Sequence, residues 1–164
     1  RGRLGVNGAV RIPARADDAL RAAVERAAAE PGVPVKAERL ADAQKVPLKF
    51  LENILASLRH AGLVESRRGP EGGYLLARPP EEITLADFIR AIDGPLAGVQ
   101  GRRPQDLAYE GVAAPLREVW VAVRAALRGV LEHVTLADVA SGTLPPEVEA
   151  LTGDPDAWVT HPPR

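Results

Sequence analysis

The chain lacks cysteine and methionine altogether, and aromatic residues make up only 4% of it. Without cysteine there can be no disulfide, no thiolate ligand and no redox sensing by thiols. No apolar run approaches the roughly 20 residues of a membrane-spanning helix, and no charged start followed by an apolar core and a cleavage site marks a secretion signal. We therefore expect a cytoplasmic protein with no membrane partner.

Motifs of common catalytic sites are missing as well. The sequence contains no Gly-rich phosphate loop, no nucleophile elbow and no HExxH helix. Its three histidines, His60, His133 and His161, are far apart in the chain, so they do not predict a shared metal site. We expect a protein that is not an enzyme and that carries no metal or cofactor.

Charge is distributed unevenly along the chain, although its net value is only −1. Residues 1–80 hold 14 Lys/Arg against 9 Asp/Glu, and residues 81–164 hold 7 against 13. A basic half favours contact with phosphates. Helical surfaces are charged in any protein, so this balance alone does not decide for a nucleic-acid partner.

The stretch from Pro47 to Ala77 is the most informative part of the sequence. Apolar residues recur at intervals of three and four over Pro47–Ala61, which predicts a helix with one buried face. The predicted buried residues are Phe50, Leu51, Ile54, Leu55 and Leu58, and the opposite face carries Lys49, Glu52, Asn53, Ser57 and Arg59. Pro47 suits the first turn of this helix, and Gly62 suits its end.

A short hairpin is predicted directly after this helix. Leu63–Ser66 and Tyr74–Ala77 have strand character, and the RRGPEGG between them supplies the turn residues. Arg67 and Arg68 then lie at an exposed tip, where guanidinium groups can contact phosphates or enter a minor groove. The alternative is a charged hairpin that only keeps the protein soluble.

Two further helices precede this unit. Arg15–Glu30 and Lys36–Gln44 are rich in helix-forming residues, and a tight turn at Lys45 and Val46 leads into Pro47. Helix, short turn and helix form the unit whose second helix enters the major groove of DNA. The sequence therefore predicts a mainly α fold with a small β-hairpin wing, that is, a winged helix-turn-helix.

From Arg15 to about Pro95 the chain resembles the IscR/NsrR/CymR family of dimeric bacterial transcription regulators. The resemblance is clearest in FLENILASLRHAGLVESRRGPEGGYLLARPPEEITLADFIRAIDGPL. It implies a bacterial protein that binds double-stranded DNA, with the helix matching Pro47–Ala61 in the major groove and the hairpin at the minor groove. By this resemblance Lys49, Glu52 and Asn53 face base edges, Arg59 approaches phosphate and Arg68 is the wing arginine; Arg67 is a less secure match, because an apolar residue is common there.

Residue chemistry assigns finer roles within this expected interface. Glu52 can accept a hydrogen bond from a cytosine amino group, and Asn53 can pair with adenine. Cations suit phosphate contacts, and those expected to make them are Arg15, Lys45, Lys49 and Arg59.

One departure from the family concerns its sensor loop. Cluster-binding members place three cysteines after the segment matching Ile83–Gly94, whereas this chain has none, so the resemblance implies a branch without an iron–sulfur cluster. In the corresponding loop, Ala97–Gly111, Arg102, Arg103 and Tyr109 are candidates for binding an anion or a planar effector. A purely structural connector is the alternative.

The second half of the chain is expected to form a dimer. Val112–Val134 reads as one long helix with an apolar seam at alternating steps of four and three, formed by Leu116, Trp120, Val123, Leu127, Val130 and Val134. An amphipathic helix lying on its own domain is the alternative, and the family resemblance favours a homodimer. Trp120 would anchor the contact.

We therefore expect five segments: a flexible extension (1–10), a winged helix-turn-helix (11–80), a connecting helix and sensor-like loop (81–111), a dimerisation helix with a short following helix (112–140) and a C-terminal tail (141–164).

Thr84 and Thr135 are expected helix N-caps. The tail is expected to be extended, with Trp158 docking on the body. Because no Met is present, we suspect that Val10 marks an alternative start codon and that residues 1–9 are not native.

The resulting hypothesis is a homodimeric transcription regulator, acting as a repressor on a palindromic operator and lacking an iron–sulfur cluster. The alternative is an interaction module that binds DNA only with a protein partner or a small effector. The sequence does not identify that effector.

Overall fold

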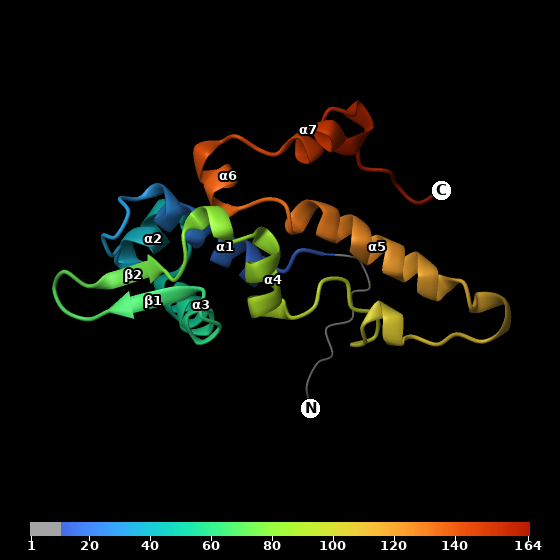
Figure 1. Ribbon diagram of the computed structural model, residues 1–164, viewed down its shortest axis with the longest axis horizontal. Helices are drawn as coiled ribbons and strands as arrows, with labels where there is room; N and C mark the ends of the chain where they lie inside the picture. Colours follow the sequence, from blue (N-terminus) through green and yellow to red (C-terminus); the bar gives the residue numbers. More distant parts are fainter. Residues whose placement is uncertain (1–10) are drawn as a thin grey trace.

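The computed structural model describes residues 11–164, and the expectations for residues 1–10 lie outside this range. The fold is mainly helical with one two-stranded hairpin, which confirms the predicted fold class. The three N-terminal helices and the hairpin form one end of the molecule, and the long helix α5 extends away from them toward the other end (Figure 1).

The observed helices of the helix-turn-helix lie close to the ranges predicted from the sequence. Helix α1 spans Ala14–Ala28, α2 spans Ala37–Gln44 and α3 spans Leu48–His60. The turn between α2 and α3 places Lys45 in the left-handed region, at a φ of 54°, and buries Val46. This sharp reversal lets α2 and α3 pack on the same core.

Phe50 is the exception to the predicted buried face of α3. Leu51, Ile54, Leu55 and Leu58 are buried, whereas Phe50 is 58% exposed. At 100° per residue Phe50 lies about 90° from the centre of the buried stripe, so the packing of α3 on α1 leaves it at the edge. The prediction that Phe50 is buried was wrong.

The wing consists of β1, Val64–Arg67, and β2, Gly73–Leu76, paired antiparallel. Its turn needs glycine, because a Cβ on Gly72 would lie 2.2 Å from the carbonyl oxygen of Arg67. Val35, before α2, exchanges two backbone hydrogen bonds with Tyr74 and extends the sheet by one bridge. The wing is thereby attached to the start of the helix-turn-helix.

One apolar core joins these elements. It includes residues from α1, α2, α3 and the wing, and also Phe88 of α4 and Leu136 of α6. Arg26 is the buried charged residue of the described chain; its Nε donates a hydrogen bond to the carbonyl oxygen of Tyr74 at 3.0 Å. Burial lowers the pKa of Arg26, and its carbonyl partners compensate part of the desolvation cost.

Helices α4, Leu85–Asp93, and α6, Leu136–Ser141, begin side by side. Thr84 and Thr135 each form a capping box with the aspartate three residues later, which confirms both predicted N-caps. Helix α6 packs mainly on α1 rather than on α5. The chain therefore returns, after α5, to the helix-turn-helix.

Helix α5 spans Leu116–Leu131 and is shorter than predicted. Residues Gly111–Ala113 form a separate 3-10 turn, and the backbone after Leu131 turns back toward α4. Val134 is consequently only 3% exposed, and its carbonyl accepts a hydrogen bond from the amide of Leu85. Val134 belongs to the protomer's own interior, so its assignment to the dimer seam was wrong.

The C-terminal segment is not extended, contrary to prediction. Residues Pro146–Thr152 form α7 and Pro155–Trp158 form a 3-10 turn. Pro146 at the first helical turn and two early glutamates favour this helix. Trp158 is 76% exposed and donates a hydrogen bond to the carbonyl of Thr152 at 2.7 Å, so it folds onto α7 instead of docking on the body.

Candidate nucleic-acid interface

The exposed face of α3 carries the residues that were predicted to read bases. Lys49, Glu52 and Asn53 are all exposed, on the side opposite the buried Leu51, Ile54, Leu55 and Leu58. Phe50 adds an exposed apolar ring beside them. Sequence periodicity had assigned Phe50 to the core and missed this position.

Arg15 reaches this face from the start of α1. One guanidinium nitrogen donates hydrogen bonds to the side-chain oxygen of Asn53 at 2.8 Å and to the hydroxyl of Ser57 at 2.9 Å. The bond from Arg15 uses one of the two lone pairs of the Asn53 side-chain oxygen, and bidentate pairing with adenine needs the other lone pair and the amide donor. Arg15 therefore orients the Asn53 side chain and leaves it the hydrogen-bonding groups that this pairing needs.

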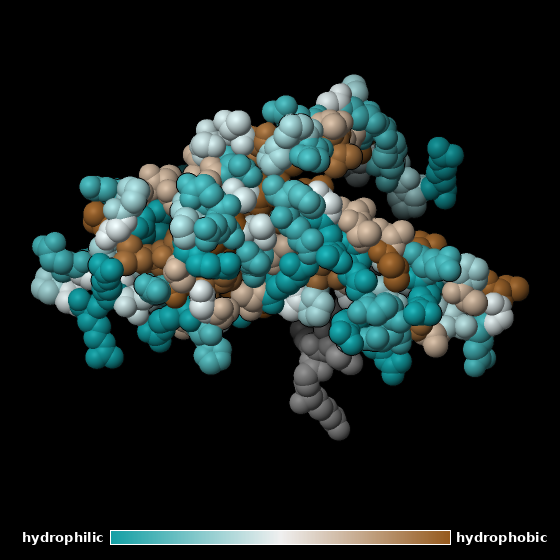
Figure 2. Space-filling model, viewed as in Figure 1, coloured by the Kyte–Doolittle hydropathy of each residue, from teal (hydrophilic) through white to brown (hydrophobic). Residues whose placement is uncertain are grey.

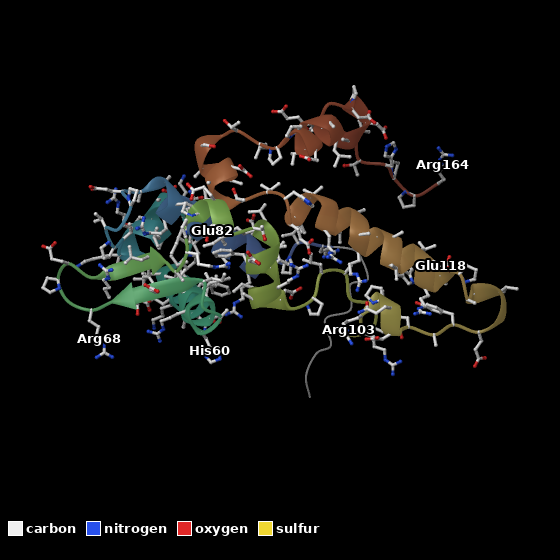
Figure 3. The ribbon with its side chains drawn as sticks, viewed as in Figure 1. His60, Arg68, Glu82, Arg103, Glu118 and Arg164 are labelled. Atoms are coloured by element: carbon white, nitrogen blue, oxygen red, sulfur yellow. The ribbon has the colours of Figure 1, made fainter. Side chains whose placement is uncertain are left out.

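The wing places a second group of cations beside α3. Arg67 ends β1, Arg68 follows it at the turn, and both are exposed. Arg68 and His60 project to the same side of the molecule, from the wing and from the end of α3 (Figure 3). Arg59 donates a hydrogen bond to the hydroxyl of Ser66 at 3.2 Å, which links the last turn of α3 to β1.

A shallow pocket of about 380 Å³ lies between α2, α3 and the wing. Glu52 and Arg67 both line it, so the structure brings together a base-reading candidate and a wing candidate. Lys36 and Glu38, at the start of α2, line it as well. Lys36 was not predicted to belong to the interface, although its position before α2 and its charge were visible in the sequence.

None of the cations predicted to contact DNA forms an ion pair with a carboxylate within residues 11–164. These cations are Arg15, Lys45, Lys49, Arg59, Arg67 and Arg68. Glu52 is the one acid among the predicted contact residues. Arg15 is half-buried and the others are exposed. Such a set of cations without carboxylate partners, around one helix and one hairpin, suits a polyanion.

The predicted dimer seam lies on α5, far from this face. Leu116 is 40% exposed and Val119 is 48% exposed, and apolar residues are visible along this part of the molecule in Figure 2. Trp120 is half-buried, and its indole donates a hydrogen bond to the hydroxyl of Tyr109 at 3.0 Å. Part of the Trp120 side chain thus packs on its own chain. Val119 is an exposed apolar residue that was not part of the predicted seam.

The three predicted effector residues have different partners within the chain. Tyr109 bonds to Trp120, the Arg103 guanidinium bonds to the carboxylate of Asp106 at 2.8 Å, and Arg102 is exposed beside a backbone bridge to Val99. Arg103 lies on the loop beneath α5, away from Arg68 (Figure 3). Binding of an effector by Arg102, Arg103 and Tyr109 stays a prediction.

Comparison with known proteins identifies close relatives. Residues 12–142 match the Rrf2 family, described as iron-dependent transcriptional regulators. The chain is 51% identical over 145 residues to Rv1287 of Mycobacterium tuberculosis, whose name describes an HTH-type transcriptional regulator; the match covers 88% of this chain and 90% of that protein. It is 36% identical over 110 residues to the HTH-type transcriptional regulator CymR of Bacillus subtilis, covering 67% of this chain and 75% of CymR.

Solved structures agree with this result. The structure of CymR, titled the global cysteine regulator of B. subtilis, superposes with a TM-score of 0.70 at 32% identity, covering 82% of this chain and 99% of that chain. IscR of T. potens superposes with a TM-score of 0.66 at 30% identity, covering 86% of this chain and 90% of that chain.

The iron in the family description does not fit the residues of this chain. The sequence has no cysteine, and no group of three or more His, Asp or Glu side chains within residues 11–164 is arranged to hold a metal ion. Within the same residues, no helix is both long and apolar enough to span a membrane.

Proposed function

The chain belongs to the Rrf2 family of transcriptional regulators, and on this premise we propose that it is a homodimeric repressor that binds a palindromic operator without an iron–sulfur cluster. The observation that carries this proposal is the group of unpaired cations around α3 and the wing. DNA binding neutralises phosphates and releases counterions. Cations that are already paired with protein carboxylates would contribute less to this neutralisation.

Residues on α3 supply the proposed base readout. Lys49, Glu52 and Asn53 are presented on its exposed face, and a recognition helix contacts base edges with such a face. Glu52 accepts a hydrogen bond from a cytosine amino group, and Asn53 pairs with adenine. Phosphates are contacted by Arg15, Lys45, Lys49 and Arg59, and the wing arginines Arg67 and Arg68 approach the adjacent minor groove.

The proposed dimer forms through α5. This helix has no buried residue in the protomer, and its exposed apolar residues need a partner to remove them from water. A two-fold axis through α5 presents two α3 helices to one DNA duplex. The half-sites would then lie roughly 34 Å apart, one helical turn of DNA, and would read as a palindrome.

Selection of bound fragments from genomic DNA by the purified protein tests the proposal. We expect recovery of a palindromic site. Affinity for this site should fall on the order of 10³-fold or more between 50 and 200 mM salt, because six or more phosphate contacts are proposed. The sign of regulation is then read from a reporter gene under the recovered site.

Arg68→Ala and Arg117→Ala form a matched pair for this experiment. Both arginines are exposed, but Arg117 lies on α5, away from the proposed interface. We expect Arg68→Ala to weaken binding and to reduce the salt dependence, and Arg117→Ala to change neither. Absence of enrichment, with binding insensitive to salt, would contradict autonomous DNA binding and favour a regulator that needs a partner or an effector.

A further inference from the structure

Four arginines line one pocket outside the proposed DNA interface. The pocket has a volume of about 280 Å³ and lies between α4, the loop after it and α5. Arg90 comes from α4, Arg103 from the loop, and Arg124 and Arg128 from α5. Three separate segments thus bring like charges together.

The carboxylates around these arginines compensate only half of their charge. Glu132 accepts hydrogen bonds from Arg90 at 2.5 Å and from Arg128 at 2.9 Å, and Asp106 pairs with Arg103 at 2.8 Å. Arg124 bonds to the side-chain amide oxygen of Gln105 and forms no ion pair with any carboxylate of residues 11–164. Four guanidiniums against two carboxylates leave a formal excess of two positive charges.

Apart from Gln105, the remaining walls of the pocket are apolar. Leu96 is 5% exposed and Pro104 is almost fully buried, and both line the pocket together with Pro95. Charge repulsion is screened less beside such walls than in open solvent. The side chains of Arg90, Arg103 and Arg128 are nevertheless 41%, 61% and 50% exposed, so solvent screens much of their repulsion, and a bound anion would lower the remainder.

We infer that this pocket binds a small dianion with oxygen acceptors, of the phosphate or dicarboxylate type. Guanidinium forks match such oxygens with paired hydrogen bonds, and two negative charges equal the excess. The volume is at the lower limit of known ligand pockets, roughly 300 to 1,000 Å³, so the ligand is small. Such a ligand would connect α4, which packs on α1 and α3, with α5.

Titration calorimetry of the full chain tests this inference without any DNA, so its outcome is independent of the proposed repressor function. The probes are inorganic phosphate and malonate, each added at constant ionic strength in chloride buffer. We expect saturable binding of at least one probe with one site per chain. Phosphate alone would identify a tetrahedral oxyanion site, and malonate alone a dicarboxylate site.

Three variants distinguish anion binding in the pocket from a general effect of the protein's charge. Arg124→Gln should raise the dissociation constant at least tenfold, because it removes the guanidinium without a carboxylate partner. Arg117→Gln removes an exposed arginine from the same helix, outside the pocket, and should leave the constant within a factor of two. Glu132→Gln should lower it, because Arg90 and Arg128 lose their shared carboxylate.

Opposite effects of Arg124→Gln and Glu132→Gln cannot arise from misfolding alone. No saturable binding of either probe to the wild-type chain would overturn the inference. It would equally be overturned if Arg124→Gln bound the probe as tightly as the wild type, or if Arg117→Gln weakened binding as much as Arg124→Gln.

Discussion

At the residue scale, Arg15 couples two helices of the proposed interface. It originates at the start of α1 and donates hydrogen bonds to Asn53 and Ser57 of α3. The orientation of Asn53 in the free protein is therefore set by a residue 38 positions away in the sequence. A contribution of Asn53 to specificity should depend on whether Arg15 is present.

We expect Asn53→Ala to lose roughly 1–3 kcal/mol of binding energy on the preferred operator and little on random DNA. Arg15→Ala should weaken binding to both, because its proposed contact is with phosphate. In the double variant the two losses should not add, since the side chains are in direct contact. Binding titrations on both DNA types measure this, and equal losses for Asn53→Ala on operator and random DNA would refute a base-reading role.

Glu132 predicts a pH dependence of stability. Hydrogen bonds from Arg90 and Arg128 lower its pKa below the ordinary value of 4.5. A carboxyl with a lowered folded-state pKa contributes stability above its unfolded pKa, and this contribution is lost as the pH falls through the folded value.

Melting temperatures of the wild type and Glu132→Gln between pH 3 and pH 7 should reveal this contribution. We expect the advantage of the wild type to be constant well above pH 4.5 and to shrink below it. Because Glu132 is at the surface, the difference should also decrease in high salt. An advantage that is the same at every pH would exclude ionisation of Glu132 as its source.

At the scale of elements, the wing depends on a turn that has no room for a side chain. A Cβ on Gly72 would overlap the backbone of Arg67 and Arg68, and the neighbouring Gly73 lies directly against the backbone of Val35. The position of Arg68 relative to α3 is therefore controlled by backbone packing as well as by strand pairing.

Gly72→Ala should displace this turn and cost on the order of 1–3 kcal/mol of stability. It should also weaken DNA binding, because Arg68 moves with the turn. Gly98→Ala is a suitable control: its new Cβ would lie 3.7 Å from the nearest carbonyl oxygen, an ordinary contact. Thermal unfolding and binding titrations of the two variants test this, and equal behaviour would disprove a steric requirement at Gly72.

At the scale of the whole molecule, the chain folds back so that α6 joins the same core as α1, α2 and α3. Helix α6 packs on α1 after the excursion through α5. The proposed segments 11–80 and 112–140 share this core through α6, so they are not independent folding units. Helix α4 also packs on the core, and the excursion away from it runs from the loop after α4 through α5. The proposed dimer contact lies on this excursion.

Val119→Glu should dissociate the proposed dimer, because it places a charge on the exposed apolar face of α5. Ala125→Glu is the matched control, since Ala125 is also exposed on the same helix, about 120° around it from Val119. We expect Val119→Glu to raise the dimer dissociation constant at least tenfold, and to reduce affinity for a full palindrome more than for a half-site.

Analytical ultracentrifugation and binding to both DNA lengths measure these effects. A wild-type chain that is monomeric at micromolar concentration would contradict the dimer. The same conclusion would follow if Val119→Glu and Ala125→Glu behaved alike.

The elements of this protein were determined largely by local sequence. Helices α1 to α3, the hairpin and the two threonine caps depend on residues within a few positions of one another, so periodicity and turn chemistry were sufficient to predict them. The cations on the exposed face of α3 were predictable for the same reason. Helix α7 had local signals too, a proline at its start and early glutamates, which the proline-rich composition of the tail obscured.

Tertiary structure alone decided the contacts between distant segments. Packing on α1 placed Phe50 outside the core, the return of the chain to α4 buried Val134, and the first turn of α1 brought Arg15 to Asn53. The four arginines of the pocket come from α4, a loop and α5, and their spacing in the sequence shows no periodicity that would predict the pocket. Such arrangements depend on how whole elements pack, and the free energy of that packing is shared among many side chains that are far apart along the chain.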